Sequence, residues 1–244
     1  MAFSIARSIR DGGLDSLVLY LDAANKNSYP GSGTNVNDLL DFKDGTLTNG
    51  VVYNSEYGGY FSFDGVNDYI RTDWNTPFGT TLYSYEAWFR TSVSQIGMLI
   101  TKRTTANNFE QFSLFIAGNS IGTTYGGKLV VYHRGGSSAT IRSWATADNY
   151  NDGNWHHVVL AKGTSSDFMY VDGKLQFTEP SSVLPDLTTD PPLLIGAANN
   201  SAASPYTLTS GHFNGDIAVA KVYNKTLSAS EVLSNYNALK YRFK

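Results

Sequence analysis

Residues 168–177 read Phe-Met-Tyr-Val-Asp-Gly-Lys-Leu-Gln-Phe, and this stretch indicates the fold class. Two alternating strand-like segments flank the pair Asp172-Gly173. Asp-Gly supplies the two positive-φ positions of a type I′ turn, the turn that joins neighbouring antiparallel strands. The stretch therefore predicts a β-hairpin.

Short runs rich in Val, Ile, Tyr, Phe and Thr recur on both sides of this hairpin. Gly, Asn, Asp and Ser break them about every 8–12 residues, a spacing typical of an antiparallel sandwich or barrel. The expected strands are 17–21, 60–63, 69–72, 83–91, 98–102, 111–117, 128–134, 140–145, 155–162, 167–171, 174–178, 193–197 and 215–223. So many strands require two stacked sheets, and we expect an all-β, two-sheet sandwich.

One helix is expected, at the end of the chain. Ser228-Ala229-Ser230-Glu231 is a capping box, in which the Ser228 hydroxyl and the Glu231 carboxylate each satisfy a backbone amide. The apolar positions that fall close to one face are Val232, Leu233, Tyr236 and Leu239. This pattern predicts a short amphipathic helix that lies against the sandwich.

The composition bounds the function. The 244 residues are 41% hydrophobic and 16% charged, which excludes disorder. The net charge is −3 with no basic run, so nucleic acid is not an expected partner. There is no cysteine, and no apolar stretch approaches the roughly 18 residues of a membrane span. The first residues lack the apolar stretch of a secretory signal, so classical secretion is unsupported.

The first fourteen residues differ in kind from the rest. Phe3, Ile5 and Ile9 stand among small and cationic residues, ahead of a break at Asp11-Gly12-Gly13. We interpret residues 1–14 as an arm that docks on a neighbouring protein, and residues 15–244 as one domain. The alternative for the arm is a disordered terminus.

Several motifs in a fixed order carry a resemblance to a known family. They are 17–23 (LVLYLDA), 29–34 (YPGSGT), 45–50 (GTLTNG), 63–69 (FDGVNDY), 152–158 (DGNWHHV), 170–173 (YVDG), 195–196 (IG), 213–218 (FNGDIA) and 223–228 (YNKTLS). Together they resemble the laminin-G-like, concanavalin A-like jelly rolls over about residues 15–240. The resemblance implies a two-sheet antiparallel jelly roll. It is greatest to the domains found in structural proteins of tailed bacteriophages.

The chain departs from that family in two places. Residues 36–44 lack the Trp and the Gly-Asn-rich loop of many relatives, and Ala218 and Val219 stand where many relatives have an acidic pair. Any function of those carboxylates is therefore expected to be lost. The glutamates Glu56, Glu86, Glu110, Glu179 and Glu231 are also far apart in sequence. A glycosidase needs two carboxyls about 5–5.5 Å apart or more, so we expect no enzyme, unless a pair assembles across strands.

His156 and His157 are adjacent on an expected strand, so their side chains point to opposite faces and cannot chelate one ion there. Calcium is a stronger candidate. Asp64 and Asp68, with Asn67 and loop carbonyls, offer the oxygen ligands that Ca²⁺ prefers. The same residues also suit a tight turn, because Asp and Asn bond their own backbone, and we favour the turn.

Sugar binding requires exposed aromatic rings beside hydrogen-bonding groups. Trp74, Trp144 and Tyr206 lie in or near expected loops and are the candidate carbohydrate-binding residues, with Tyr125 and Tyr150 as further aromatic residues. The alternative is that most aromatic side chains fill strands.

Two functional hypotheses follow. The first is a non-enzymatic virion structural protein of a tailed phage. It would sit on the capsid, tail or fibre, contact other virion proteins through Phe3, Ile5 and Ile9, and form homo-oligomers on the particle surface. Low charge suits packing against protein. The alternative is a carbohydrate-binding or host-adhesion module that binds a host surface glycan, with or without calcium.

Overall fold

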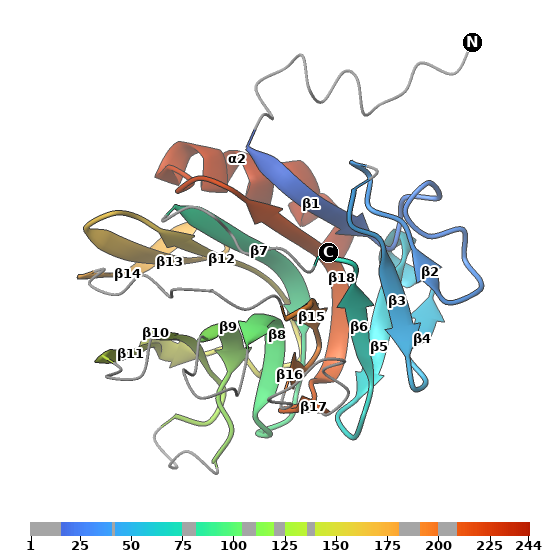
Figure 1. Cartoon of the computed structure of the whole chain (residues 1–244), viewed down its shortest axis with the longest axis horizontal. Helices are drawn as coiled ribbons and strands as arrows, with labels where there is room; N and C mark the ends of the chain where they lie inside the picture. The colour runs from blue at the N-terminus through green and yellow to red at the C-terminus, as the bar shows by residue number, and fades with distance from the viewer. Residues whose placement is uncertain are drawn as a thin grey trace.

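The chain folds into two large antiparallel β-sheets that stack face to face, and the one α-helix of the described residues lies outside them (Figure 1). The computed structural model describes residues 16–40, 42–74, 82–103, 111–119, 125–135, 140–180, 191–199 and 209–244. This architecture confirms the predicted all-β, two-sheet sandwich with a short C-terminal helix.

The first sheet has eight strands in the described chain. Its order is β14 (Lys174–Pro180), β13 (Ser166–Val171), β12 (Trp155–Lys162), β7 (Tyr83–Arg90), β18 (Asn214–Tyr223), β5 (Tyr60–Asp64) and β4 (Val52–Asn54), and β1 (Leu17–Asp22) also pairs with β18. The last strand of the chain is therefore central. It pairs with β1 and with β7, so the first and the last strand of the described chain lie side by side in one sheet.

The second sheet also has eight strands in the described chain. Its order is β11 (Thr140–Asn149), β10 (Lys128–Gly135), β9 (Gln111–Ile116), β8 (Gly97–Arg103), β15 (Leu193–Ile195), β6 (Tyr69–Thr72), β3 (Gly45–Thr48) and β2 (Asn35–Val36). A small separate pair joins β16 (Ala198–Asn199) to β17 (Thr209–Ser210). The sequence did not predict the short strands β2, β3, β4, β16 and β17. Each has only two to four residues, so its alternation is a weak signal.

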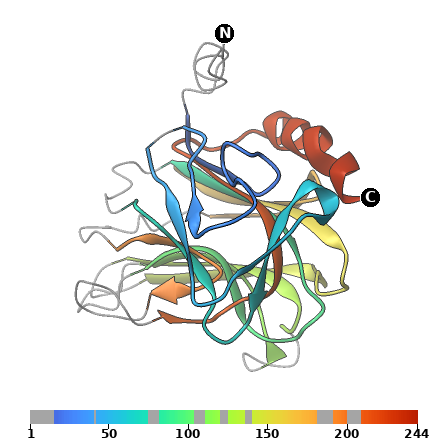
Figure 2. The ribbon, with the colours of Figure 1, turned by 90° about the vertical axis from the view of Figure 1, so that its right-hand side faces the viewer.

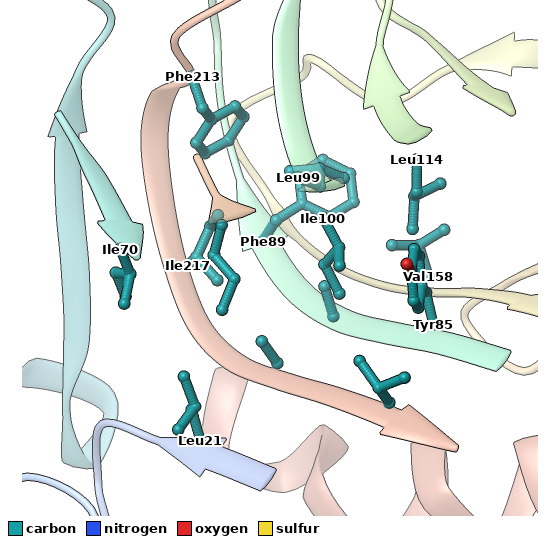
Figure 3. Close-up of a cluster of buried hydrophobic side chains, with 14 of the residues drawn as sticks. Leu21, Ile70, Tyr85, Phe89, Leu99, Ile100, Leu114, Val158, Phe213 and Ile217 are labelled. Atoms are coloured by element: carbon teal, nitrogen blue, oxygen red, sulfur yellow. The ribbon is translucent and has the colours of Figure 1, made fainter. Parts of the chain in front are cut away.

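Side chains that alternate along the strands build the core between the sheets. In β7, Tyr85, Ala87 and Phe89 face the other sheet, whereas Glu86 and Trp88 face outward. Figure 3 shows Phe89 beside Leu99, Ile217 and Phe213, which come from both sheets and a loop. These side chains are at most 2% exposed. Burial of such apolar surface drives the two sheets together.

The predicted hairpin is confirmed between β13 and β14. Asp172 and Gly173 have φ values of 51° and 76°, as a type I′ turn requires. The carboxylate of Asp172 accepts the amide of His157 at 2.9 Å, which ties the turn to β12.

The C-terminal helix α2 (Ala229–Leu239) begins at the predicted capping box. The Ser228 Oγ accepts the Glu231 amide, and the Ser228 amide donates to Glu231 Oε2 at 2.9 Å. Figure 2 shows α2 on the outer side of the first sheet. Val232 is buried there, but Leu233 is 47% exposed, so the predicted apolar face was wrong at Leu233. A helix that rests on a flat sheet covers only a narrow stripe of its own surface.

A short 3₁₀ turn, Lys240–Phe243, continues α2 along the sheet. The Phe243 ring stacks on Trp88 at a centroid distance of 4.4 Å, and Tyr236 stacks on the same indole at 5.7 Å. Arg242 donates to Asp22 Oδ1 at 2.7 Å and to the Tyr57 carbonyl at 2.6 Å. The C-terminal segment is thus fastened to both the start and the centre of the chain. No helix in the described ranges is long and apolar enough to cross a membrane.

Candidate functional site

A hollow lies over the outer face of strands β8 to β11. The strand register places Met98 opposite Phe115, Phe115 opposite Val130, and Val130 opposite Ala145. Because facing residues point to the same side, these four form one apolar row across the sheet. The row is the floor of the hollow.

Aromatic side chains surround this floor. Tyr125 and Tyr132 line the hollow, and Tyr125 is 45% exposed. Trp144 also borders it, but Trp144 pairs with Val131 and its ring packs against the core between the sheets. The hollow has a volume of about 960 Å³, within the range of small-molecule binding sites. Exposed aromatic rings beside an apolar floor offer a stacking surface to a flat, partly apolar ligand such as a sugar ring.

Polar groups complete the hollow. Lys128, Ser143, Thr146 and Gln176 line it together with the aromatic rings. Gln176 comes from β14 of the first sheet, and its Oε1 accepts the Tyr150 hydroxyl at 2.9 Å. Hydroxyl, amide and ammonium groups can donate to and accept from the hydroxyls of a glycan.

The candidate carbohydrate-binding residues have different positions. Trp144 borders the hollow but its ring packs against the core, whereas Tyr206 lies outside the described residues. Trp74 was expected in an exposed loop, and this expectation was wrong because its side chain is only 5% exposed in the core. The Trp74 carbonyl accepts the Leu193 amide at 3.2 Å, and its own amide donates to Thr72 Oγ1 at 3.3 Å. These bonds hold the segment against β15.

The two further aromatic candidates, Tyr125 and Tyr150, also lie in different places. Tyr125 lines the hollow, and Tyr150 is mostly buried with its hydroxyl directed to Gln176. Tyr132, Lys128 and Gln176 also line the hollow, and none of them was predicted as a site residue from the sequence. Only the register between strands brings them to one place, and the sequence gives no direct signal of that register. The arm residues Phe3, Ile5 and Ile9 lie outside the described residues.

The candidate calcium residues form a self-capped turn after β5. Asp64 Oδ1 accepts the Val66 amide at 2.8 Å and the Asn67 amide at 3.3 Å. Asp68 Oδ2 accepts the Asp64 amide at 3.1 Å. These are the bonds of the turn interpretation, since Asp side chains here satisfy nearby backbone amides. The Val66 amide in particular holds the pKa of the Asp64 carboxyl below its usual range.

The second carboxylate of this turn is buried. Asp68 is 3% exposed, and its Oδ1 has no hydrogen-bond partner among the described residues. Burial raises the pKa of this carboxyl. Ca²⁺ takes six to eight oxygen ligands, and the described residues contain no group of three acidic or histidine side chains that could hold a metal.

The two adjacent histidines face opposite sides of β12, as predicted. The His156 ring packs near Phe89 and Tyr150, with its Nδ1 2.9 Å from Asp172 Oδ2 and its Nε2 3.1 Å from Asp152 Oδ1. His157 is buried on the other face beside Trp88. They therefore cannot share an ion.

A buried ionic cluster lies under α2. Glu86 Oε1 is 2.8 Å from the Lys221 ammonium and 3.3 Å from His157 Nε2. Its Oε2 accepts the Tyr223 hydroxyl at 2.9 Å and the Asn235 amide at 2.6 Å. All of the Glu86 side chain is buried, so α2 and its neighbours keep this carboxylate from a substrate. The cluster fastens the helix to the sheet.

The fold and the hollow together define a lectin-like β-sandwich. The chain belongs to the concanavalin A-like lectin/glucanases superfamily, because a laminin-G family model described by that name matches residues 64–233. This confirms the predicted resemblance to the laminin-G-like, concanavalin A-like domains. No curated protein matches the chain.

Solved structures share the fold at low sequence identity. Domain 4 of the arabinanase AbnA from Geobacillus stearothermophilus, in complex with arabinotriose, superposes with a TM-score of 0.67 and 16% identity over 90% of this chain and 97% of that domain. The binding domain of botulinum neurotoxin serotype D gives 0.65 and 15% over 92% of this chain and 52% of the other. The binding domain of botulinum neurotoxin DC, in complex with SialylT, gives 0.65 and 16% over 93% and 52%. The chain spans about half the length of these toxin domains.

Proposed function

We propose that this protein is a non-enzymatic glycan-binding module and that the hollow over β8 to β11 is its binding site. The observation that carries the proposal is the combination of an apolar floor, the rings of Tyr125 and Tyr132, and the hydrogen-bonding side chains of Lys128, Ser143 and Gln176 around one hollow. Sugar recognition uses stacking on aromatic faces together with a few placed polar groups. The sugar ligand of the arabinanase domain adds support by analogy of fold alone.

The hollow favours binding over hydrolysis. Among its described lining residues there is no carboxylate, whereas most glycosidases use two. Glu86, the glutamate nearest the centre of the first sheet, is buried in the cluster under α2. A bound oligosaccharide should therefore leave the protein unchanged, as chromatography of the ligand after incubation would show.

The test of glycan binding is a glycan array probed with the full chain, followed by calorimetry with the best ligand. Tyr125→Ala removes the exposed ring of the hollow and should weaken binding by about tenfold or more, the scale of one lost stacking contact. Tyr241→Ala is the matched control, because Tyr241 is 70% exposed on the C-terminal turn, and it should bind like the parent. Equal affinity of the two variants, or no glycan bound at all, would refute the proposal.

The place of the chain in a tailed-phage virion is a second, finer proposal that the sequence resemblance supports. On a particle, glycan binding at the hollow would serve adhesion to a host surface, and the arm would attach the domain to capsid or tail subunits. Cosedimentation with particles that lack the protein tests this. Replacing Phe3, Ile5 and Ile9 together by Ser should abolish cosedimentation and leave glycan binding intact. Cosedimentation of this variant at the parent level would contradict the role of the arm.

A further inference from the structure

The hollow carries positive charge. Lys128 is the one charged side chain among the described residues that line it. No carboxylate of the described chain lies within 4.0 Å of the Lys128 ammonium. Asp148 is on the neighbouring strand β11, but its side chain is not among those that line the hollow. Within the described ranges, the charge of Lys128 thus has no partner of opposite sign.

A bulge in β11 holds this ammonium in place. The register pairs Lys128 with Asn149 and Val130 with Ala145, so β11 advances four residues where β10 advances two. The bulge directs two backbone carbonyls to the Lys128 ammonium, that of Thr146 at 3.1 Å and that of Ala147. The ammonium has three N–H donors, and the two carbonyls leave one for a ligand.

The bulge is itself held by Thr146, whose side chain is buried. Its Oγ1 accepts the Leu129 amide at 3.1 Å and donates to the Asp148 carbonyl at 2.9 Å. The position of the cation is therefore part of the fold, set by hydrogen bonds on both strands. A group held in this way loses little conformational entropy when a ligand arrives.

We infer that the hollow selects glycans that carry a carboxylate, and that Lys128 is the residue that recognises it. This inference rests on the proposed function. A carboxylate would accept the remaining N–H of Lys128 in a charge-assisted hydrogen bond, which is stronger than a bond between neutral groups. The apolar floor of Met98, Phe115 and Val130 lowers the local dielectric and strengthens that attraction. A cationic glycan would be repelled.

The experiment uses the full chain on a glycan array with uronic-acid, sialic-acid, neutral and amino-sugar glycans. The best carboxylated ligand is then compared with its methyl ester, which keeps the ring and removes the charge. We expect the acid to bind about tenfold or more tightly than the ester, the scale of one charge-assisted hydrogen bond. This comparison needs no variant of the protein.

Substitutions then locate the effect. Lys128→Gln removes the charge but keeps an N–H donor for the carbonyls, and it should abolish the preference for acid over ester. Lys128→Arg keeps the charge and should retain the preference. Lys244→Gln removes an exposed cation at the C-terminus and should change nothing. Thermal unfolding of each variant checks that it is folded.

The outcomes separate the two proposals. If neutral glycans bind as well as acidic ones, and Tyr125→Ala weakens them, the carboxylate inference is overturned and the glycan-binding proposal stands. If the preference for acid survives Lys128→Gln in a folded protein, Lys128 is not the recognising residue. If no glycan binds, both proposals fall.

Discussion

Glu86 on β7 and Lys221 on β18 form an ion pair of 2.8 Å beneath α2, with both residues buried. Burial alone would raise the pKa of the Glu86 carboxyl, but the Lys221 charge and the His157 imidazole 3.3 Å away outweigh it and hold the pKa well below its usual range. Glu86 therefore stays ionised. The helix α2 packs over this ion pair, and its Asn235 side chain donates a hydrogen bond to Glu86 Oε2.

Breaking this pair should be costly. Glu86→Ala leaves the Lys221 ammonium buried without its partner, and we expect a loss of about 3–5 kcal/mol in the free energy of unfolding. Lys221→Met should cost a similar amount for the reciprocal reason. The double variant should lose clearly less than the two single losses combined, because no unpaired charge remains. Urea unfolding measures all three, and strictly additive losses would contradict the coupling.

The His156 bridge predicts a pH dependence. Burial opposes protonation of His156, but the hydrogen bonds and charges of Asp172 and Asp152 outweigh it and raise the pKa of its imidazole. A neutral imidazole has one N–H and cannot donate to both carboxylates. The stability that the bridge contributes is therefore complete below about pH 6.5, the unfolded-state pKa of histidine, and is lost as the pH rises through the higher folded-state value.

The measurement is the difference in unfolding free energy between the parent and His156→Gln from pH 5 to pH 9. The difference should shrink as the pH rises. Asp152→Asn tests the bridge from its other side, because Asp152 Oδ1 faces His156 Nε2. Asp172 is less suitable for this test, because it also accepts the His157 amide. Asp152→Asn should lower the His156 pKa in an NMR titration. A difference that is constant with pH would rule out the bridge as its cause.

The capping box should account for about 1 kcal/mol of stability. Ser228→Ala leaves the Glu231 amide without its acceptor at the start of α2, and the loss should be in the range of roughly 0.5–2 kcal/mol. Ser234→Ala is the control on the same helix. Ser234 is exposed in the helix interior, where Ala is the better helix former, so that change should be neutral or slightly stabilising. Thermal unfolding measures the stability of both variants. An equal effect of the two changes would contradict the role of Ser228 as the N-cap.

Arg242 should be needed to hold the C-terminal turn. Its guanidinium donates to Asp22 and to the carbonyls of Tyr57 and Gly59. Arg242→Ala should cost about 2–3 kcal/mol, because a charged hydrogen-bond network is lost and the Asp22 carboxylate remains partly buried. Arg242→Lys should recover only part of this stability. The planar guanidinium of Arg reaches three acceptors at once, and the compact ammonium of Lys cannot. Hydrogen exchange of the α2 amides would rise in the Ala variant; unchanged exchange would contradict the anchor.

The extent to which the fold could be predicted from the sequence depended on local signals. Trp155–Lys162 and Tyr69–Thr72 matched their predicted ranges because alternation and flanking turn residues mark both ends. Asp172-Gly173 determined its own turn, and Ser228 with Glu231 determined the start of α2. Each of these signals acts within a few residues of the chain.

The hollow could not be predicted in the same way. Trp144 was identified as a sugar-binding candidate, but so was Trp74, whose ring is in the core. Both are tryptophans near predicted strand ends, and the sequence alone does not separate them. Both rings contact the core, but they differ in exposure. Trp74 is held against β15 by backbone bonds and is 5% exposed, whereas Trp144 is on the edge strand β11 and stays partly exposed at the border of the hollow.

The sequence by itself determined the hairpin, the helix start and the two-sheet class, because turn geometry, capping and hydrophobic alternation act locally. Only the tertiary structure decided that Met98, Phe115, Val130 and Ala145 form one floor and that Lys128 lies beside it. Those positions depend on the register between strands and on a bulge in β11, and a shift of one residue would turn each side chain to the opposite face.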